Sequence, residues 1–244
     1  MPLTFHHSLT PHFHTMARTG WRGGKRLALS WHPAVSGVVQ GTGMASTISE
    51  DASSYLYDAD AGGPYIEALS GDSTNDDSYI STVTGYYTFV PKANLYMTVR
   101  FSLPVITNTR FLTGLIPYGN RTSVTGSDDP SQSMIGLQFS TGRGDTNFQF
   151  IHSDASTMVL VDTGVAPATD VIYQWEMEYS GGGMALRGRL SDHTGAVLMA
   201  DTSHTATEAQ FTTNEEVSLS PFIGEDTLTT ADAKFRFYRT EVWL

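Results

Sequence analysis

The sequence predicts an all-β protein, an antiparallel β-sandwich of the jelly-roll type with an extended N-terminal arm. Three observations predict this class. Apolar and polar residues alternate with a period of two in several short runs. Glycine-rich turns separate these runs, and no stretch with helical periodicity exceeds two turns. The chain of 244 residues is 40% hydrophobic and 11% aromatic, which suffices for one large core.

The chain is divided at residue 60 by its composition. Residues 1–60 are expected to form an arm and linker, because the first 30 residues show no lasting period and are rich in glycine, histidine and positive charge. Residues 61–244 are expected to form the sandwich, with strands beginning near Tyr65. A loop-like arm needs a partner surface to hold it, so we assign it to assembly. The predicted assembly residues are His6, His7, His12, His14, Trp21, Arg22 and Trp31.

Alternating runs predict the strands of the sandwich. In each run every second side chain would face the core. Short turns join neighbouring runs and place glycine where a hairpin needs a positive φ. The runs are 95–103, 135–139, 148–150, 173–179, 184–190 and 235–243, and the turns are 142–145, 180–183 and 192–195.

The net charge of −11 and the absence of cysteine exclude several functions. An acidic chain gains nothing from neutralising phosphates, so we expect no nucleic-acid partner. The same charge and the lack of a run of about 18 apolar residues argue against membrane insertion. Without cysteine there is no disulfide, thiol chemistry or Cys-ligated zinc. Residues 1–15 lack the basic start and apolar stretch of a signal peptide.

Catalytic motifs are few, and we predict that the protein is not an enzyme. The sequence has no G-x-S-x-G elbow, no H-E-x-x-H and no phosphate-binding glycine loop before a helix. Glu176 and Glu178 lie two residues apart and would share one strand face, as a pair of glycosidase carboxylates can. A solvated strand face is the alternative interpretation, and we favour it.

Two patterns could hold a metal ion. His12 and His14 would point the same way in an extended segment, so a trimer could bring three such pairs around one ion. Acid pairs at 76–77 and 128–129 lie in loops of the kind that can bind Ca²⁺. Chance histidines and solvated acids are the favoured alternatives. We therefore predict no cofactor and leave a structural metal ion open.

Two further patterns concern recognition. Arg143-Gly144-Asp145 has the sequence of a cell-attachment tripeptide, but a hairpin turn favours Gly and Asp there for backbone reasons, so we interpret it as a turn. Aromatic rings beside a loop amide suit sugar stacking with hydrogen bonds, and they suit core edges or subunit contacts equally well. The candidate glycan contacts of this kind are Tyr86, Tyr87, Tyr118 and Asn120.

The stretch from about Tyr79 onward resembles the concanavalin A-like (lectin/glucanase) jelly-roll domain of tailed-virus virion proteins of the fibre, turret or decoration type. The residues that carry the resemblance are the runs 173–179 and 184–190, the hairpin 190–198 and the closing segments 220–224 and 235–243. Neither the catalytic acids of the glucanases nor the metal-binding pattern of legume lectins is recognisable in the sequence.

The resemblance implies a non-enzymatic structural protein of a virion, an extracellular particle. Such a protein would form a homo-oligomer, with a trimer favoured, and would contact other virion proteins through its arm. The alternative function is a carbohydrate-binding or host-receptor-binding adhesin module, with host surface glycans as partners. A glycan-cleaving enzyme is the third and least favoured hypothesis.

Overall fold

A computed structural model of the chain describes residues 27–33, 39–42, 45–49, 54–71, 74–82, 95–117, 127–130, 133–154, 158–180, 185–205 and 219–244. All regular secondary structure in these residues is β-strand. No helix that could span a membrane is found among the described residues. The strands are β1 (Leu27–Pro33), β2 (Val39–Thr42), β3 (Ala45–Ser49), β4 (Ser54–Asp60), β5 (Gly63–Leu69), β6 (Asp77–Thr82), β7 (Leu95–Ser102), β8 (Thr109–Pro117), β9 (Ser133–Ser140), β10 (Gln149–Asp154), β11 (Met158–Asp162), β12 (Ile172–Ser180), β13 (Ala185–Asp192), β14 (Val197–Thr205), β15 (Leu219–Thr227) and β16 (Lys234–Trp243).

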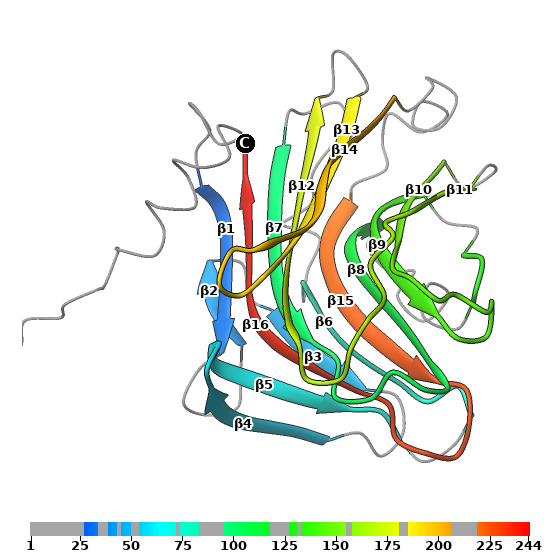
Figure 1. The fold of residues 1–244 in the computed structure, drawn as a ribbon. Coiled ribbons are helices and arrows are strands. Elements are labelled where there is room, and N and C mark those ends of the chain that lie inside the picture. The colour runs from blue at the N-terminus through cyan, green and yellow to red at the C-terminus, as the bar shows by residue number, and fades with distance from the viewer. Residues whose placement is uncertain are drawn as a thin grey trace, which may run out of the picture.

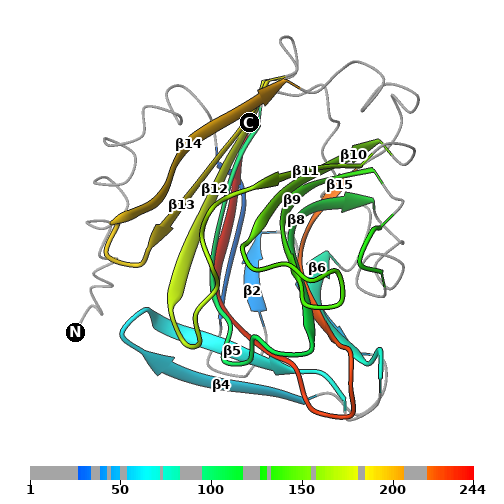
Figure 2. The ribbon, with the colours of Figure 1, turned by 45° about the vertical axis from the view of Figure 1, so that its right-hand side comes forward.

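Two sheets face each other and form a sandwich (Figure 1; Figure 2). The nine-stranded sheet has the order β14-β13-β12-β7-β16-β1-β2, and the hairpin β4–β5 joins it through β16. The seven-stranded sheet has the order β11-β10-β9-β8-β15-β6-β3. The strand pairs are antiparallel in both sheets, which confirms the predicted fold class.

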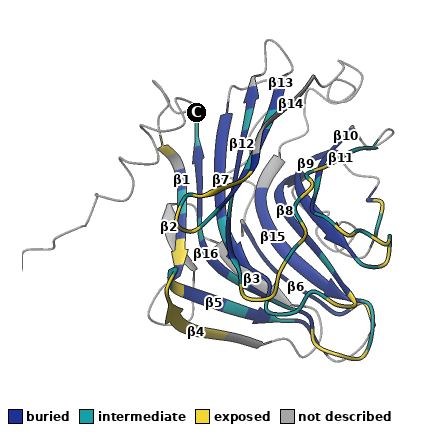
Figure 3. Ribbon diagram, viewed as in Figure 1, coloured by how far each residue is buried: buried dark blue, intermediate teal, exposed yellow. Residues whose placement is uncertain are grey.

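The core lies between the two sheets and follows from the alternation in the sequence. From the nine-stranded sheet, Phe101 of β7 and Trp175 of β12 point inward, and from the other sheet Phe111 and Phe150 meet them. The Phe101 and Phe111 rings stack at 4.6 Å, and Phe150 packs edge-on against Trp175 at 5.3 Å. Each such side chain contributes roughly 1.5–3 kcal/mol by leaving water. Figure 3 shows this buried layer along the central strands of both sheets.

The sandwich begins earlier in the chain than the sequence analysis predicted. Strands β1 to β4 all precede residue 61, and β1 lies in the nine-stranded sheet between β16 and β2. Leu29 and Trp31 on β1 are fully buried in the core. The boundary at residue 60 and the strand start near Tyr65 were therefore wrong.

Trp31 is a core residue, so its assignment to an assembly arm is corrected. The reason is a long-range pairing: β1 aligns with β16, at the far end of the sequence, with Trp31 opposite Thr240. The sequence pattern around Trp31 does not reveal a partner strand so far away in the chain. The other predicted assembly residues, His6, His7, His12, His14, Trp21 and Arg22, lie outside the described residues.

Candidate functional site

The outer face of the nine-stranded sheet, opposite the core, carries polar side chains in ordered rows. The pairing of β12, β7 and β16 aligns Gln174, Arg100 and Arg239 in one row across the sheet. The next row aligns Glu176, Thr98 and Glu241. Side chains that lie directly opposite on adjacent strands are close enough to interact, so each row forms a continuous polar strip.

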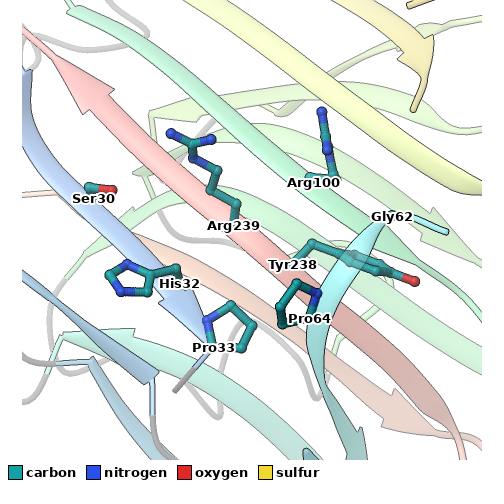
Figure 4. Close-up of a pocket in the computed structure, with 8 residues that line it drawn as sticks. All are labelled: Ser30, His32, Pro33, Gly62, Pro64, Arg100, Tyr238 and Arg239. Atoms are coloured by element: carbon teal, nitrogen blue, oxygen red, sulfur yellow. The ribbon is translucent and has the colours of Figure 1, made fainter. Parts of the chain in front are cut away.

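A hollow of about 410 Å³ opens on this face (Figure 4). Its walls come from β1, from the turn between β4 and β5, from the start of β5, from β7 and from β16. This volume lies in the range of pockets that bind small molecules. The residues that line the hollow are Ser30, His32, Pro33, Gly62, Pro64, Arg100, Tyr238 and Arg239.

A β-bulge in β16 places two successive side chains in the hollow. The register of β16 against β7 shifts between Phe237 and Arg239, so Tyr238 is the extra residue. Before the bulge Phe235 and Phe237 face the core, and after it Val242 does. The core positions thus change from odd to even residue numbers. Bulges commonly re-aim side chains in this way next to binding sites.

Tyr238 is fixed from several sides. Its hydroxyl donates a hydrogen bond to Oδ2 of Asp60 at 2.5 Å, and its ring lies 5.5 Å from the ring of Tyr65. Burial raises the pKa of Tyr238 far above its ordinary value, so the hydroxyl stays neutral. A Cβ atom on Gly62 would lie 2.9 Å from the Tyr238 ring and 2.7 Å from Cδ1 of Ile172, so a larger residue at this turn would have to displace these side chains.

Arg100 and Arg239 bring two guanidinium groups to the same hollow (Figure 4). Arg100 donates from Nη2 to Oε1 of Gln174 at 3.0 Å, and Gln174 donates in turn to Oε1 of Glu176 at 2.7 Å. Burial lowers the pKa of Arg100, and the nearby Glu241 carboxylate opposes this shift. Arg239 forms an ion pair with Glu241, whose side chain is buried.

Glu176 and Glu178 share one face of β12, as the sequence predicts, and that face is the outer one. Glu178 forms an ion pair with Arg187 at 3.6 Å. Glu176, however, is only 1% exposed and accepts the hydrogen bond from Gln174. The favoured interpretation of a solvated strand face was therefore wrong for Glu176, because a row of neighbouring side chains encloses it.

The acid pair at 128–129 is engaged with protein groups. Asp128 accepts a hydrogen bond from Nε of Arg110 at 2.7 Å and another from Ser140. Burial alone would raise the pKa of Asp128, but the hydrogen bonds from Arg110 and Ser140 lower it below its ordinary value. Among the described residues, no group of three or more His, Asp or Glu is placed to hold a metal ion.

The Arg143-Gly144-Asp145 tripeptide forms part of the turn between β9 and β10. Its two charged ends bind each other: Arg143 contacts Asp145 through Nε at 2.9 Å and through Nη2 at 2.5 Å. Both side chains are largely shielded from solvent. A receptor would have to break this ion pair, so the geometry supports the interpretation as a turn.

The predicted glycan contacts Tyr86, Tyr87, Tyr118 and Asn120 lie outside the described residues. The sequence analysis missed the residues that line the hollow. Two signals could have found them. One is that the apolar positions change from odd to even residue numbers along 235–242, which marks the bulge. The other is the alternation of Leu29 and Trp31 with Ser30 and His32, which marks β1 as a strand.

Comparisons with known proteins bear on the fold. No model of a protein family matches the chain, and no curated protein matches it either. Among solved structures, a protein of unknown function from Shewanella oneidensis MR-1 is similar with a TM-score of 0.63 and 15% identity, over 88% of this chain and 84% of that one.

Two further solved structures share the architecture. An endo-β-1,4-glucuronan lyase from the fungus Trichoderma reesei has a TM-score of 0.54 and 8% identity, over 89% of this chain and 95% of that one. A seed lectin from Lotus tetragonolobus has a TM-score of 0.52 and 9% identity, over 81% and 97%. The chain therefore shares its β-sandwich fold with this lectin and this lyase.

Proposed function

We propose that this protein binds carbohydrate in the hollow between β1, β5, β7 and β16. The observation that carries the proposal is the composition of the lining. Planar hydrogen-bonding groups from Arg100, Arg239 and His32 surround the hollow, and the pyrrolidine rings of Pro33 and Pro64 add apolar surface. Sites that orient a small ligand typically combine an apolar wall with a small number of polar groups that converge on the ligand. A fold shared with a lectin and a polysaccharide lyase supports the same proposal.

We propose that the protein binds carbohydrate without cleaving it. The support is that the carboxylate pair on β12 is already engaged, Glu178 with Arg187 and Glu176 with Gln174. Prolonged incubation with any bound oligosaccharide should release no new chain ends. The appearance of shorter products that depend on Glu176 would contradict this part of the proposal.

A glycan array with the intact chain, followed by calorimetry with the best glycan, tests the proposal. Arg239→Ala should weaken binding by about tenfold or more, because hydrogen bonds to a charged group contribute about 1.5–3 kcal/mol. Arg187→Ala is the matched control, since Arg187 lies on the same sheet, pairs with Glu178 and does not line the hollow. The proposal fails if the array retains no glycan, or if both variants bind like the wild type.

A structural role in a virion is our second proposal, and the observation behind it is one of composition. The leading residues carry four of the fourteen positive charges, at Arg18, Arg22, Lys25 and Arg26, in a chain of net charge −11. A basic segment on an acidic chain suits docking onto an acidic surface or a neighbouring copy.

Deletion of residues 1–26 tests this second proposal. The deletion must stop before Leu27, because Leu29 and Trp31 belong to the core. We expect the truncated chain to keep its thermal unfolding midpoint and to lose the trimer or larger assembly in analytical ultracentrifugation. A truncated chain that assembles like the full chain, or a full chain that is monomeric, would count against an assembly arm.

A further inference from the structure

We infer that residues 12–19 of one copy pair, as an added strand, with the outer edge of β4 in a second copy. This inference rests on the second proposal above, an assembly role for the leading residues, and names the surface that receives them. It comes from the backbone of β4 and from the distribution of charge along the chain.

β4 is an edge strand whose odd-numbered residues turn their backbone groups outward. Among the described residues, β5 is the only strand that pairs with β4. A two-residue turn closes the hairpin on the pair Asp60–Gly63, so hydrogen-bonded and non-hydrogen-bonded pairs alternate from there. Pro64, which has no N–H, lies opposite Ala59 at a non-hydrogen-bonded pair. Tyr57 lies at the next pair of this kind, so its N–H and C=O point away from β5.

The edge of β4 lacks features that commonly prevent further pairing. Edge strands are often protected by Lys, by Pro or by a β-bulge. Residues 54–60 contain neither Lys nor Pro, and their register with β5 has no shift. Leu56 and Tyr57 are 57% and 37% exposed, and Figure 3 shows the described part of β4 as exposed. The edge is therefore open to a further strand.

Charge complementarity favours a basic strand at this edge. The hairpin 54–69 contains Asp58, Asp60 and Glu67 but no Lys or Arg. A second β4 strand would bring like charges together, which destabilises a pair of strands. Residues 1–26 carry four positive charges and no acid, whereas the rest of the chain holds all 25 acids and the other ten positive charges. The leading segment is therefore the part of the chain that suits this edge.

Residues 12–19 match β4 in length and in alternation. They form a run without Pro or Gly, so nothing in it interrupts an extended strand. Side chains alternate between the two faces of a strand, and three side chains of this run that can carry positive charge would share one face. The acids of β4 also share one face, so pairing can place the two sets side by side. The side chains in question are His12, His14 and Arg18 on the run and Asp58 and Asp60 on β4.

The position of β1 favours a second copy over the same copy as the source of this strand. Pro33, at the end of β1, lines the hollow together with Gly62 and Pro64 of the β4–β5 hairpin. Leu27 begins β1, and Figure 1 shows β1 running from there toward the hairpin. A strand rises about 3.3 Å per residue, so β1 places roughly 20 Å between Leu27 and the hairpin turn. The leading residues therefore join the sandwich at the end of β1 that is remote from β4.

Leu56→Lys tests the edge in the full chain. A lysine on an edge strand discourages further pairing, and here it would also repel the basic segment. Because Leu56 is exposed, the variant should keep the thermal unfolding midpoint of the wild type. Analytical ultracentrifugation should show that the dissociation constant of the assembly rises about tenfold or more. Val197→Lys, at an exposed position on the edge strand β14, is the matched control and should assemble like the wild type.

Two substitutions of Tyr57 separate backbone pairing from side-chain contact. Tyr57→Pro removes the outward N–H and leaves the hydrogen bonds between β4 and β5 in place. Tyr57→Ala removes the ring and keeps the N–H. We expect Tyr57→Pro to raise the dissociation constant of the assembly about tenfold or more and Tyr57→Ala to change it only a few fold. Thermal unfolding of both variants establishes that they are folded.

The outcomes distinguish this inference from the assembly role on which it rests. If Leu56→Lys and Tyr57→Pro assemble like the wild type while deletion of residues 1–26 dissociates the assembly, the leading residues bind elsewhere and the inference is overturned. Equal weakening by Leu56→Lys and Val197→Lys would overturn it too, because the loss would not be specific to β4. A full chain that is monomeric at every concentration would remove both the inference and the assembly role.

Discussion

Glu225 lies inside the sandwich and is almost fully buried. Its Oε1 accepts a hydrogen bond from Ser78 Oγ at 3.4 Å, and burial raises the pKa of its carboxyl well above the ordinary value. The next residue, Asp226, points to the other face and pairs with Arg110. Burial raises the pKa of Asp226 to about 7 in spite of that pairing. Two adjacent acids thus hold protons more tightly in the folded state than in the unfolded chain.

These two residues give stability a defined pH dependence. Because both folded pKa values lie above the unfolded ones, the folded state binds more protons, and stability falls as pH rises from about 4 toward 7 and above. Each group contributes a slope of at most about 1.4 kcal/mol per pH unit.

Glu225→Gln should reduce this slope and raise the free energy of unfolding at pH 8, since the amide is uncharged at every pH. Urea unfolding at several pH values between 5 and 8 measures how the free energy of unfolding depends on pH. Asp232→Asn, at an exposed position, is the control and should leave the slope unchanged. If Glu225→Gln shows the wild-type slope, the carboxyl is not the group that titrates.

Strand β1 is the element on which the sequence and the structure differ most. The strands β7, β12 and β13 could be predicted because apolar and polar residues alternate along them, and β16 because Phe235 and Phe237 alternate with polar residues at its start. β1 has the same alternation over a shorter run, but glycines and positive charges precede it and hide the signal. The hollow could not be predicted, because it needs the pairing of β1 with β16 and the register shift at Tyr238, and both are properties of strand pairs.

Trp31→Ala tests the place of β1 in the fold. Trp31 is fully buried, so the substitution should lower the free energy of unfolding by about 3–5 kcal/mol. Chemical denaturation measures this loss. A change below about 1 kcal/mol would mean that β1 is dispensable, as an assembly arm would be.

At the scale of the whole molecule, the sandwich provides two separate surfaces of polar chemistry. The outer face of the nine-stranded sheet carries the hollow with its two guanidinium groups. On the seven-stranded sheet, Arg110 and Arg143 are engaged with Asp128, Asp226 and Asp145. The hollow combines polar side chains with proline rings on a concave surface, as sites for small ligands do. The hollow is therefore where we expect a ligand.

A crystal structure of the protein with a bound oligosaccharide tests this expectation most directly. We predict density for at least one sugar ring in the hollow, in contact with Pro33 and Pro64 and within hydrogen-bond distance of Arg100 or Arg239. An oligosaccharide bound on another face, with the hollow filled only by solvent, would contradict the account.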